Sequence, residues 1–389
     1  MKIQWYGART RATVPMISLA ILAIGCGFGQ GADLGLSVDS HGVLTRHGVP
    51  YRGIGVNYYD AFLRTLRNSN DHSYEEGFAA LGANGIPFAR IAASGYNPGD
   101  LSLYLSDKEA YLRQLDGVVE SAKQANVGLI ASLFWSIDAV SKAVGEPRSR
   151  WGDSASATRR FMRQYTKDVV SRYADSPAIW GWEFSCELSL PVDLKPGTGM
   201  PERALTYETF RNAALDFAQT VREIDPQRIV VTGNSLPRPA AYHNANGGRP
   251  GVDTVDQFAR ILIRDNPGLF SPICIHASLA GVDPYFADRR VSYQELLETC
   301  MQIGRTVNKP VYVEEFVATA RPGSFTSMNE SQYFSTQLAA IENSGVPLAS
   351  VWVYDRKLLP DRSNLTFDND RAYMLRMIAE FDKAVHARN

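Results

Sequence analysis

The chain has 389 residues, of which 45% are hydrophobic and 21% are charged, as expected of a globular protein with a large core. The formal net charge is −1, so the sequence lacks the basic field that nucleic-acid binding requires, and no nucleic-acid partner is expected. The length allows either one large domain or two smaller ones.

Residues 1–26 have the features of an export signal. A basic start without acids is followed by an apolar run over residues 14–24, which is too short to span a bilayer. Small residues surround Cys26 at the end of this run. We therefore expect a signal peptide over residues 1–26 and export of the remaining chain to the periplasm, to the outer membrane or to the medium.

The end of this segment leaves two alternatives open. Ala23-Ile24-Gly25-Cys26 resembles the lipobox of bacterial lipoproteins, in which the cysteine is lipidated and becomes the N-terminal residue. In that case Cys26 would attach the protein to a membrane. The alternative is simple cleavage after Gly27 or Ala32.

The other cysteines are Cys186, Cys274 and Cys300, an odd number without CxxC spacing. A disulfide framework and a zinc site are therefore both unexpected. The sequence predicts neither a metal nor an organic cofactor.

After the signal segment, residues 34–50 read as two short strands around the turn Asp39-Ser40-His41-Gly42, a hairpin that can plug one end of a barrel. From Tyr51 onward, apolar runs of strand length alternate with amphipathic helical stretches. Strands are predicted at Tyr51–Tyr58, Phe88–Ser94, Val127–Trp135, Ile179–Glu187, Ile229–Asn234, Ile273–Ser278, Pro310–Phe316 and Leu348–Tyr354. Helices are predicted at Ser73–Asn84, Asp107–Asn126, Ala155–Tyr173, Ala204–Ile224, Thr254–Asp265, Ser292–Asn308, Asn329–Ser344 and Asp370–His386.

Eight successive strand–helix units favour a closed (β/α)₈ barrel, the TIM barrel of the α/β class, over an open sheet. The strands are apolar at nearly every position, which is typical of a parallel sheet that is covered on both faces. No linker or repeat divides the chain after the signal, so we expect a single domain over residues 33–389.

Active-site residues of such barrels lie at the C-terminal ends of the strands. Applied to this chain, the rule collects two acids, a cation, an imidazole, an amide and three aromatic residues at one rim: Tyr58, Arg90, Trp135, Glu187, Asn234, His276, Glu315 and Trp352. Polar groups and aromatic rings together suit a carbohydrate, whose hydroxyls need polar partners and whose C–H faces pack on rings.

Cleavage of a glycosidic bond needs one carboxylic acid that protonates the leaving oxygen and one carboxylate that attacks the sugar or activates water. Glu187 and Glu315 end the fourth and seventh strands, so they face each other across the barrel. We expect their carboxyl groups about 5–5.5 Å apart, the separation of retaining enzymes.

Around these acids the sequence resembles glycoside hydrolase family 5, the cellulase and mannanase family. Trp182-Glu183-Phe184-Ser185-Cys186-Glu187-Leu188 is similar to the family pattern W-E-x-x-N-E-P, and Lys309–Phe316 is similar to K-P-x-x-x-x-E-F. The resemblance covers roughly residues 35–385. It implies Glu187 as acid/base, Glu315 as nucleophile and three supporting or sugar-binding residues, namely Arg90, His276 and Trp352.

Three positions depart from the family pattern. Cys186 stands where the family has an asparagine that binds the sugar 2-hydroxyl, and a thiol is a weaker donor. Ser278 replaces a tyrosine that contacts the nucleophile, and Phe134-Trp135 stand on the third strand where the family has a histidine. The acids are kept while their surroundings differ, which leaves room for a different substrate or reaction.

Neighbouring residues receive structural interpretations. Strand alternation predicts that Glu314 points away from Glu315 and pairs with the surrounding helices. Glu183 is expected in a buried ion pair below the rim. Trp135, Trp151 and Tyr285 are either sugar platforms or core residues.

The sequence thus predicts an exported retaining hydrolase that acts on a β-linked oligo- or polysaccharide. Two alternatives stay open: a transglycosidase that uses the same two acids, and a non-catalytic glycan-binding lipoprotein, which would have no need of two opposed carboxylates. The oligomeric state cannot be predicted from the sequence.

Overall fold

The computed structural model describes residues 34–194, 205–247, 251–279, 285–287, 289–319, 328–358 and 362–387. Residues from Ala32 to Asn389 form one compact unit. The predicted signal peptide and Cys26 lie outside the described residues. Among the helices of the described ranges, none is long and apolar enough to cross a membrane.

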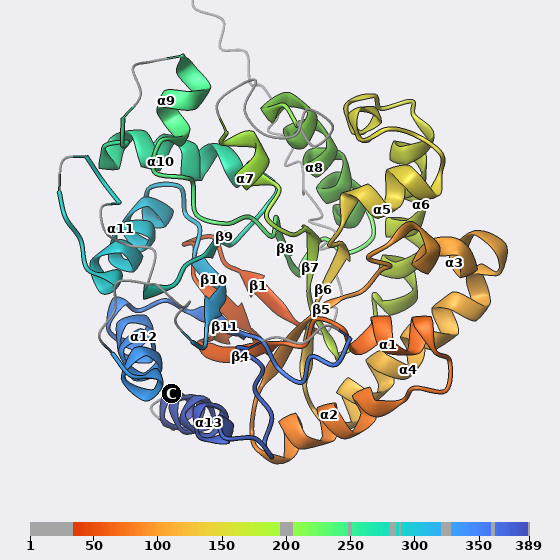
Figure 1. Ribbon diagram of the computed structural model, residues 1–389, viewed down its shortest axis with the longest axis horizontal. Helices are drawn as coiled ribbons and strands as arrows, with labels where there is room; N and C mark the ends of the chain where they lie inside the picture. Colours follow the sequence, from red (N-terminus) through yellow and green to blue (C-terminus); the bar gives the residue numbers. More distant parts are fainter. Residues whose placement is uncertain are drawn as a thin grey trace, which may run out of the picture. The chain divides into compact units, whose positions relative to one another are not determined.

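Eight parallel strands form the barrel (Figure 1). Around the ring the hydrogen-bonded order is β8-β7-β6-β5-β4-β11-β10-β9, which follows the chain order from β4 to β11. All eight strands lie within one or two residues of the predicted runs or inside them: β4 (Gly53–Asn57), β5 (Phe88–Ala92), β6 (Gly128–Phe134), β7 (Ile179–Ser185), β8 (Ile229–Val231), β9 (Ile273–His276), β10 (Val311–Val317) and β11 (Leu348–Trp352). The predicted (β/α)₈ fold is confirmed.

The eight predicted helices surround these strands (Figure 1). They are α2 (Ser73–Ala83), α4 (Lys108–Gln124), α6 (Ala157–Tyr173), α8 (Tyr207–Arg222), α10 (Val255–Asp265), α11 (Tyr293–Thr306), α12 (Glu330–Ser344) and α13 (Ala372–His386). Six of them begin at a capping side chain that accepts a hydrogen bond from a backbone N–H of the first turn, namely that of Asp107, Ser156, Thr206, Thr254, Ser292 or Asn329.

Short helices between these units were not predicted. They are α1 (Ala61–Arg67), α3 (Ser102–Ser106), α5 (Ile137–Ala143), α7 (Ser189–Val192) and α9 (Ala241–Asn246), with the 3₁₀ turns η1 (Pro98–Leu101) and η2 (Arg148–Gly152). A segment of four to seven residues covers at most two turns, so its hydrophobic period is too short to recognise. These segments build the rim at the C-terminal ends of the strands.

The ring has a seam between β8 and β9, where the described residues contain no parallel ladder. One backbone hydrogen bond, from Ser271 N–H to the Val230 carbonyl at 3.0 Å, crosses it. The side chain of Asn266 completes the closure, because its Oδ1 accepts from Thr232 Oγ1 and from the Cys274 N–H, both at 3.0 Å. An amide side chain thus replaces part of a missing ladder.

A small antiparallel sheet closes the N-terminal end of the barrel. It consists of β1 (Leu36–Val38), β2 (Leu44–Arg46) and β3 (Val49–Pro50), of which the first two form the predicted hairpin. Leu36 and Leu44 are buried in a cluster of residues from the early parts of the barrel strands: Phe88, Ile130, Trp180, Ile229, Cys274, Tyr312 and Leu348. The hairpin is therefore a plug, as expected. The third strand was missed because it has only two residues.

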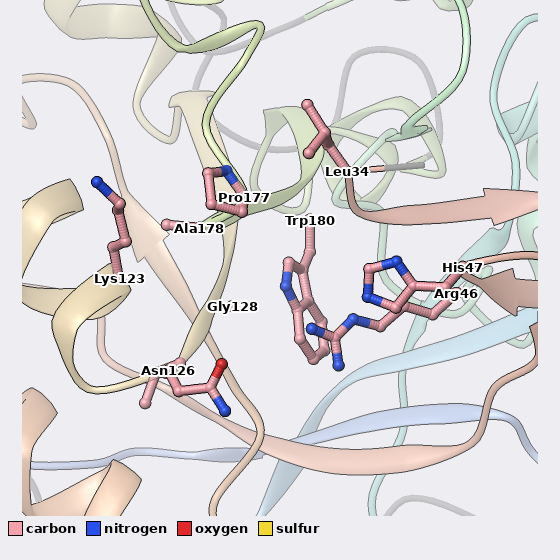
Figure 2. Close-up of a pocket in the computed structure, with 10 residues that line it drawn as sticks. Leu34, Arg46, His47, Lys123, Asn126, Gly128, Pro177, Ala178 and Trp180 are labelled. Atoms are coloured by element: carbon pink, nitrogen blue, oxygen red, sulfur yellow. The ribbon is translucent and has the colours of Figure 1, made fainter. Parts of the chain in front are cut away.

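A pocket lies beside this plug, at the end of the barrel away from the predicted rim (Figure 2). In Figure 2 the guanidinium of Arg46 lies next to the indole of Trp180, and its carbon is 4.0 Å from the ring centre. None of the predicted site residues lines this pocket. Its lining consists of Leu34, Arg46, His47, Lys123, Asn126, Val127, Gly128, Pro177, Ala178 and Trp180.

The plug should contribute measurably to stability. Leu36→Ala removes a fully buried side chain, and we expect the free energy of unfolding to fall by about 2–5 kcal/mol. Val49→Ala, in the same sheet but 61% exposed, is the control and should change it by less than about 0.5 kcal/mol. Urea unfolding followed by circular dichroism measures both. Equal effects of the two changes would mean that the sheet does not pack against the barrel.

Candidate active site

The centre of the rim is the side chain of Arg90 on β5, which is fully buried. Its Nε and Nη2 donate to the two oxygens of Glu183 at 2.6 and 2.8 Å. Its Nη1 donates to Asn57 Oδ1 at 2.9 Å and to Glu315 Oε1 at 2.6 Å. A buried guanidinium needs such partners, and the bidentate pair with Glu183 fixes its plane. The structural ion pair expected for Glu183 is confirmed.

Glu187 lies two residues after the end of β7, in a backbone conformation that is uncommon for a non-glycine residue, with φ at +54°. Its N–H donates to the Gly233 carbonyl at 2.7 Å. The side chain is 43% exposed, which makes it the most accessible acid of the group. The turn therefore presents the Glu187 carboxyl to the open side of the rim.

Glu314 and Glu315 are both near Arg90, which strand alternation did not predict. The register of β10 against β9 shifts between Val313 and Glu315, so the strand carries a bulge there. Glu314 is fully buried, and its Oε1 lies 3.5 Å from Arg90 Nε. The prediction that Glu314 points to the outer helices is wrong, because the bulge suspends the alternation of side chains.

His276, at the end of β9, contacts three carboxylates. Its Nδ1 lies 3.0 Å from Glu187 Oε1 and 3.5 Å from Glu315 Oε2. Its Nε2 lies 3.1 Å from Glu314 Oε2. The imidazole thus contacts both predicted catalytic acids through Nδ1 and a third, buried acid through Nε2.

The charges of these groups shift their protonation. Burial lowers the pKa of His276, but the negative charge of Glu315 and the hydrogen bonds to Glu187 and Glu314 outweigh it and raise the pKa to about 10. Burial raises the pKa of Glu187, whereas the hydrogen bond and charge of His276 lower it more, so the net shift is downward. In the free protein the pair is therefore an imidazolium and a carboxylate.

A second pair lies deeper. Burial raises the pKa of Glu183 to about 8, against the opposing charge of Arg90, and its carboxyl shares a hydrogen bond with Glu314. Arg90 and His276 outweigh the effect of burial on Glu314 and lower its pKa. The pKa values of the two buried carboxyl groups are thus shifted in opposite directions, upward for Glu183 and downward for Glu314.

Cys186 lies beside Glu315. Its Sγ is 3.9 Å from Glu315 Oε1, within the range of a weak thiol hydrogen bond. Burial and the charge of Glu315 raise the pKa of the thiol well above its usual value, so the sulfur keeps its proton in the free protein. The predicted substrate-binding position is thus in direct contact with the predicted nucleophile.

Aromatic rings form one wall of this region. Trp135 after β6 and Trp352 at the end of β11 have ring centres 6.1 Å apart, and Tyr59 packs on both. The guanidinium of Arg90 stacks on Trp135 with its carbon 4.0 Å from the ring centre. Trp135 is largely buried, whereas Trp352 is partly open. Both residues lie where the sequence predicted them.

Tyr58 does not belong to this wall, and its assignment to the substrate site is wrong. It is fully buried, packs on Phe78 of α2 and donates its hydroxyl hydrogen to Asp355 Oδ2 at 2.9 Å. The side chain that turns toward Trp135 is that of Tyr59, one position later. Successive side chains of a strand point to opposite faces of the sheet, so an error of one position selects a residue on the wrong face.

Other candidates are structural. Trp151 and Tyr285 are both buried, so neither ring offers an open face to a sugar. Trp151 donates its indole N–H to the Ile137 carbonyl, and Tyr285 donates its hydroxyl hydrogen to the Pro237 carbonyl. Asn234 is buried and accepts from the Ser189 N–H. The hydroxyl oxygen of Ser278 accepts a hydrogen bond from the backbone N–H of Val317 on β10.

Comparison of the sequence with known proteins finds no matching family model. Segments of the chain are similar to fungal mannanases. A probable mannan endo-1,4-beta-mannosidase F of Neosartorya fischeri is 28% identical over 35% of this chain and 31% of its own length. Mannan endo-1,4-beta-mannosidase A of Podospora anserina is 33% identical over 41% of this chain and 40% of its own length. The chain thus spans about a third to two fifths of these curated relatives.

Solved structures match the fold over nearly the whole chain. An endo-1,4-beta-mannanase from Rhizomucor miehei has a TM-score of 0.63 at 15% identity, with 90% of this chain and all of that one covered. A glycoside hydrolase family 5 mannosidase from the same organism has a TM-score of 0.60 at 13% identity, with 92% and 100% covered. A beta-glucanase from Saccharophagus degradans has a TM-score of 0.56 at 14% identity, with 90% and 94% covered.

Fold and sequence point to the same class of protein. The barrel has the same (β/α)₈ fold as these solved glycoside hydrolases, which agrees with the expected α/β class. The two curated relatives named above are mannanases, and one of the solved structures is a glycoside hydrolase family 5 mannosidase, which agrees with the resemblance noted in the sequence.

The backbone beside Glu187 offers a test of this geometry. Gly233 has φ at +74°, and a Cβ there would lie 1.5 Å from the Ser185 carbonyl oxygen. We expect Gly233→Ala to destabilise the protein by the strain of a left-handed residue, about 1–2 kcal/mol, and by a further ~1–3 kcal/mol of crowding.

Gly247, at the end of α9, is the matched control for this change. It has a similar φ of +66°, but nothing lies within 4 Å of the position of its Cβ. Gly247→Ala should therefore show the strain alone. Thermal or urea unfolding gives both values, and equal losses would show that the strand ends are further apart than described.

Proposed function

We propose that the protein is a retaining glycoside hydrolase that cleaves a β-linked, mannan-type polysaccharide. The main support for this proposal is the closeness of the two acids. Glu187 Oε1 and Glu315 Oε2 lie 3.0 and 3.5 Å from the same nitrogen, His276 Nδ1. Because both oxygens are measured from one nitrogen, the distance between them cannot exceed the sum of these two values. That upper limit only reaches the lower end of the carboxyl separations of inverting enzymes, which are roughly 6.5–9.5 Å. This proximity supports double displacement.

In the proposed first step, Glu315 attacks the anomeric carbon and Glu187 gives its proton to the leaving oxygen, so that a glycosyl ester on Glu315 and a free sugar end form. In the second step Glu187 takes a proton from water, whose oxygen attacks the anomeric carbon and releases Glu315. No metal or cofactor is needed for either step.

Arg90 and His276 have supporting roles in this proposal. Arg90 holds Oε1 of Glu315, which leaves Oε2 toward the sugar. His276 lowers the pKa of Glu187 in the free protein, so the acid must regain its proton when substrate binds. A bound sugar covers Glu187 and removes its water, and burial acts in the direction that raises this pKa.

Trp352 and Trp135 would support the C–H faces of the sugar ring, while Cys186 faces the ring beside the nucleophile. The mannanases among the relatives favour mannan over other β-linked glycans as substrate. Transglycosylation uses the same groups, with a sugar hydroxyl in place of water. A non-catalytic glycan-binding role is favoured by one observation, the thiol that lies against the predicted nucleophile at 3.9 Å.

The two glutamates can be distinguished with an activated aryl mannoside, whose leaving group needs no proton. Glu315→Gln should lower kcat/KM on the order of 10³-fold or more for both this substrate and mannan. Glu187→Gln should lose mannan cleavage to the same extent but should still release the aryl group in a burst, because only the step that needs the base is slow.

Glu120→Gln, an exposed side chain on α4, is the control and should keep wild-type rates. Product anomers observed by NMR test retention of configuration. The binding role would be favoured by two results together. Wild type and Glu315→Gln would bind mannan equally well, and the wild type would turn over no member of a panel of β-mannans, β-glucans and exopolysaccharides.

We also propose that the protein is exported, with lipidation of Cys26 and simple signal cleavage as the two alternatives. The basis is the sequence of residues 1–26, which resembles a lipoprotein signal. If Cys26 is lipidated, labelling of producing cells with a fatty-acid analogue should tag the wild type and leave Cys26→Ser untagged, with Cys300→Ser as the control that keeps its label. An exported but untagged wild type would mean simple signal cleavage, and retention in the cytoplasm would contradict export altogether.

A further inference from the structure

Three different metal-ligand atoms converge at the rim. Cys186 Sγ, His276 Nδ1 and a carboxylate oxygen of Glu315 all lie within 4.8 Å of one another. The sulfur is 3.9 Å from Glu315 Oε1, and Nδ1 is 3.5 Å from Glu315 Oε2. The three residues come from the ends of β7, β9 and β10, so the convergence is produced by the barrel and not by a local sequence motif.

These separations are close to those of a tetrahedral metal site. Zinc binds thiolate sulfur, imidazole nitrogen and carboxylate oxygen at about 2.3, 2.0–2.1 and 2.0–2.2 Å, which sets ligand atoms roughly 3.4–3.6 Å apart. Since all three pairs of atoms lie within 4.8 Å, each separation has to shrink by about 1.4 Å at most. This movement falls to the side chains of Cys186 and Glu315, which are both only partly buried. It starts from a Glu315 carboxyl whose Oε1 accepts from Arg90 Nη1 at 2.6 Å.

The surroundings suit a metal-bound histidine. Nε2 of His276 contacts Glu314 Oε2 at 3.1 Å, and Glu314 is fully buried. A carboxylate on the far nitrogen keeps the Nε2 proton in place, as around most zinc-bound histidines. Nδ1, which contacts Glu187 Oε1 at 3.0 Å in the free protein, can then bind a metal once its own proton has left. The ring is therefore oriented in advance.

We propose that Cys186, His276 and Glu315 form a binding site for a thiophilic divalent cation of the zinc class. A thiolate with an imidazole and one carboxylate selects zinc and its chemical relatives over Mg²⁺ or Ca²⁺, which require several oxygen ligands. With three protein ligands, the fourth position remains open to water from the cleft.

Binding exchanges protons for the cation. The metal displaces the proton of the Cys186 thiol and the Nδ1 proton of the His276 imidazolium, while the proton on Nε2 stays in its bond to Glu314. No electrons are transferred, and two protons are released to solvent for each cation bound.

Occupancy has a functional consequence, which rests on the proposed function. The cation would coordinate Glu315 through the carboxylate that attacks the sugar and would stand in the space of the anomeric carbon. Zinc would therefore inhibit cleavage in competition with substrate. The sequence alone predicted no zinc site, because the three ligands are far apart in the chain.

Binding can be tested without reference to activity. The full chain with Cys26→Ser in every variant is titrated with ZnCl₂ by calorimetry and with CoCl₂ by absorption. We expect one Zn²⁺ per chain and a sulfur-to-cobalt charge-transfer band. Cys186→Ser should lose the band and weaken Zn²⁺ binding at least about 100-fold, since serine is not a zinc ligand of such sites.

Cys300→Ser is the matched control, because Cys300 is a buried free thiol away from the rim and should leave the band and the affinity unchanged. His276→Gln is a second ligand variant with an expected loss similar to that of Cys186→Ser. MgCl₂ should not compete with Zn²⁺. Absence of a cobalt–sulfur band in the wild type, or equal Zn²⁺ affinity of Cys186→Ser and wild type, would overturn the site.

The functional consequence is measured separately, as the effect of ZnCl₂ on mannan cleavage by wild type and Cys300→Ser. Inhibition that raises KM and leaves kcat unchanged is expected. Zinc binding at Cys186 without inhibition would contradict only the overlap with Glu315, and a protein that binds zinc but cleaves no glycan would contradict the proposed function while the metal site stands.

Discussion

The rim depends on one buried cation. The guanidinium of Arg90 has no access to solvent, so its free energy is favourable only if carboxylates and an amide surround it. Glu183, Asn57 and Glu315 supply four hydrogen bonds in fixed directions. The position of Glu315 is thereby set from below by a residue on β5, before any substrate contact is made. Loss of the arginine would leave several carboxylates facing one another in a region of low polarity.

His276 is the second cation of this system and acts from the other side. Arg90 and His276 each contact Glu314 and Glu315, so the two positive charges are linked through the bulged pair of acids on β10. The shift of register at Val313 is what allows two consecutive acids to reach the same network. An ordinary strand would have sent one of them to the helices and would have left His276 with fewer partners.

The sequence was sufficient to predict all eight barrel strands and the helices that follow them, because strands covered on both faces are apolar throughout and the helices are long enough to show their period. Arg90, Glu187, His276 and Glu315 were predicted to lie together since strand ends converge in this fold. The errors have local causes. Glu314 was misplaced by a bulge that no residue pattern reveals, and Tyr58 was exchanged with Tyr59 because strand phase is lost at the last residue. The convergence of Cys186 with His276 and Glu315 is a property of the closed ring.

Because of the seam between β8 and β9, the free energy needed to separate neighbouring strands differs around the barrel. Separation of two neighbouring strands elsewhere breaks a ladder of backbone bonds, whereas separation here breaks one backbone bond and the contacts of the Asn266 amide. Transient opening therefore concentrates on this side, and amide protons of β8 and β9 exchange with solvent through smaller fluctuations than those of β5 and β6. Because β9 ends on His276, the side of the ring that loosens first is also the side that carries the imidazole shared by the acids.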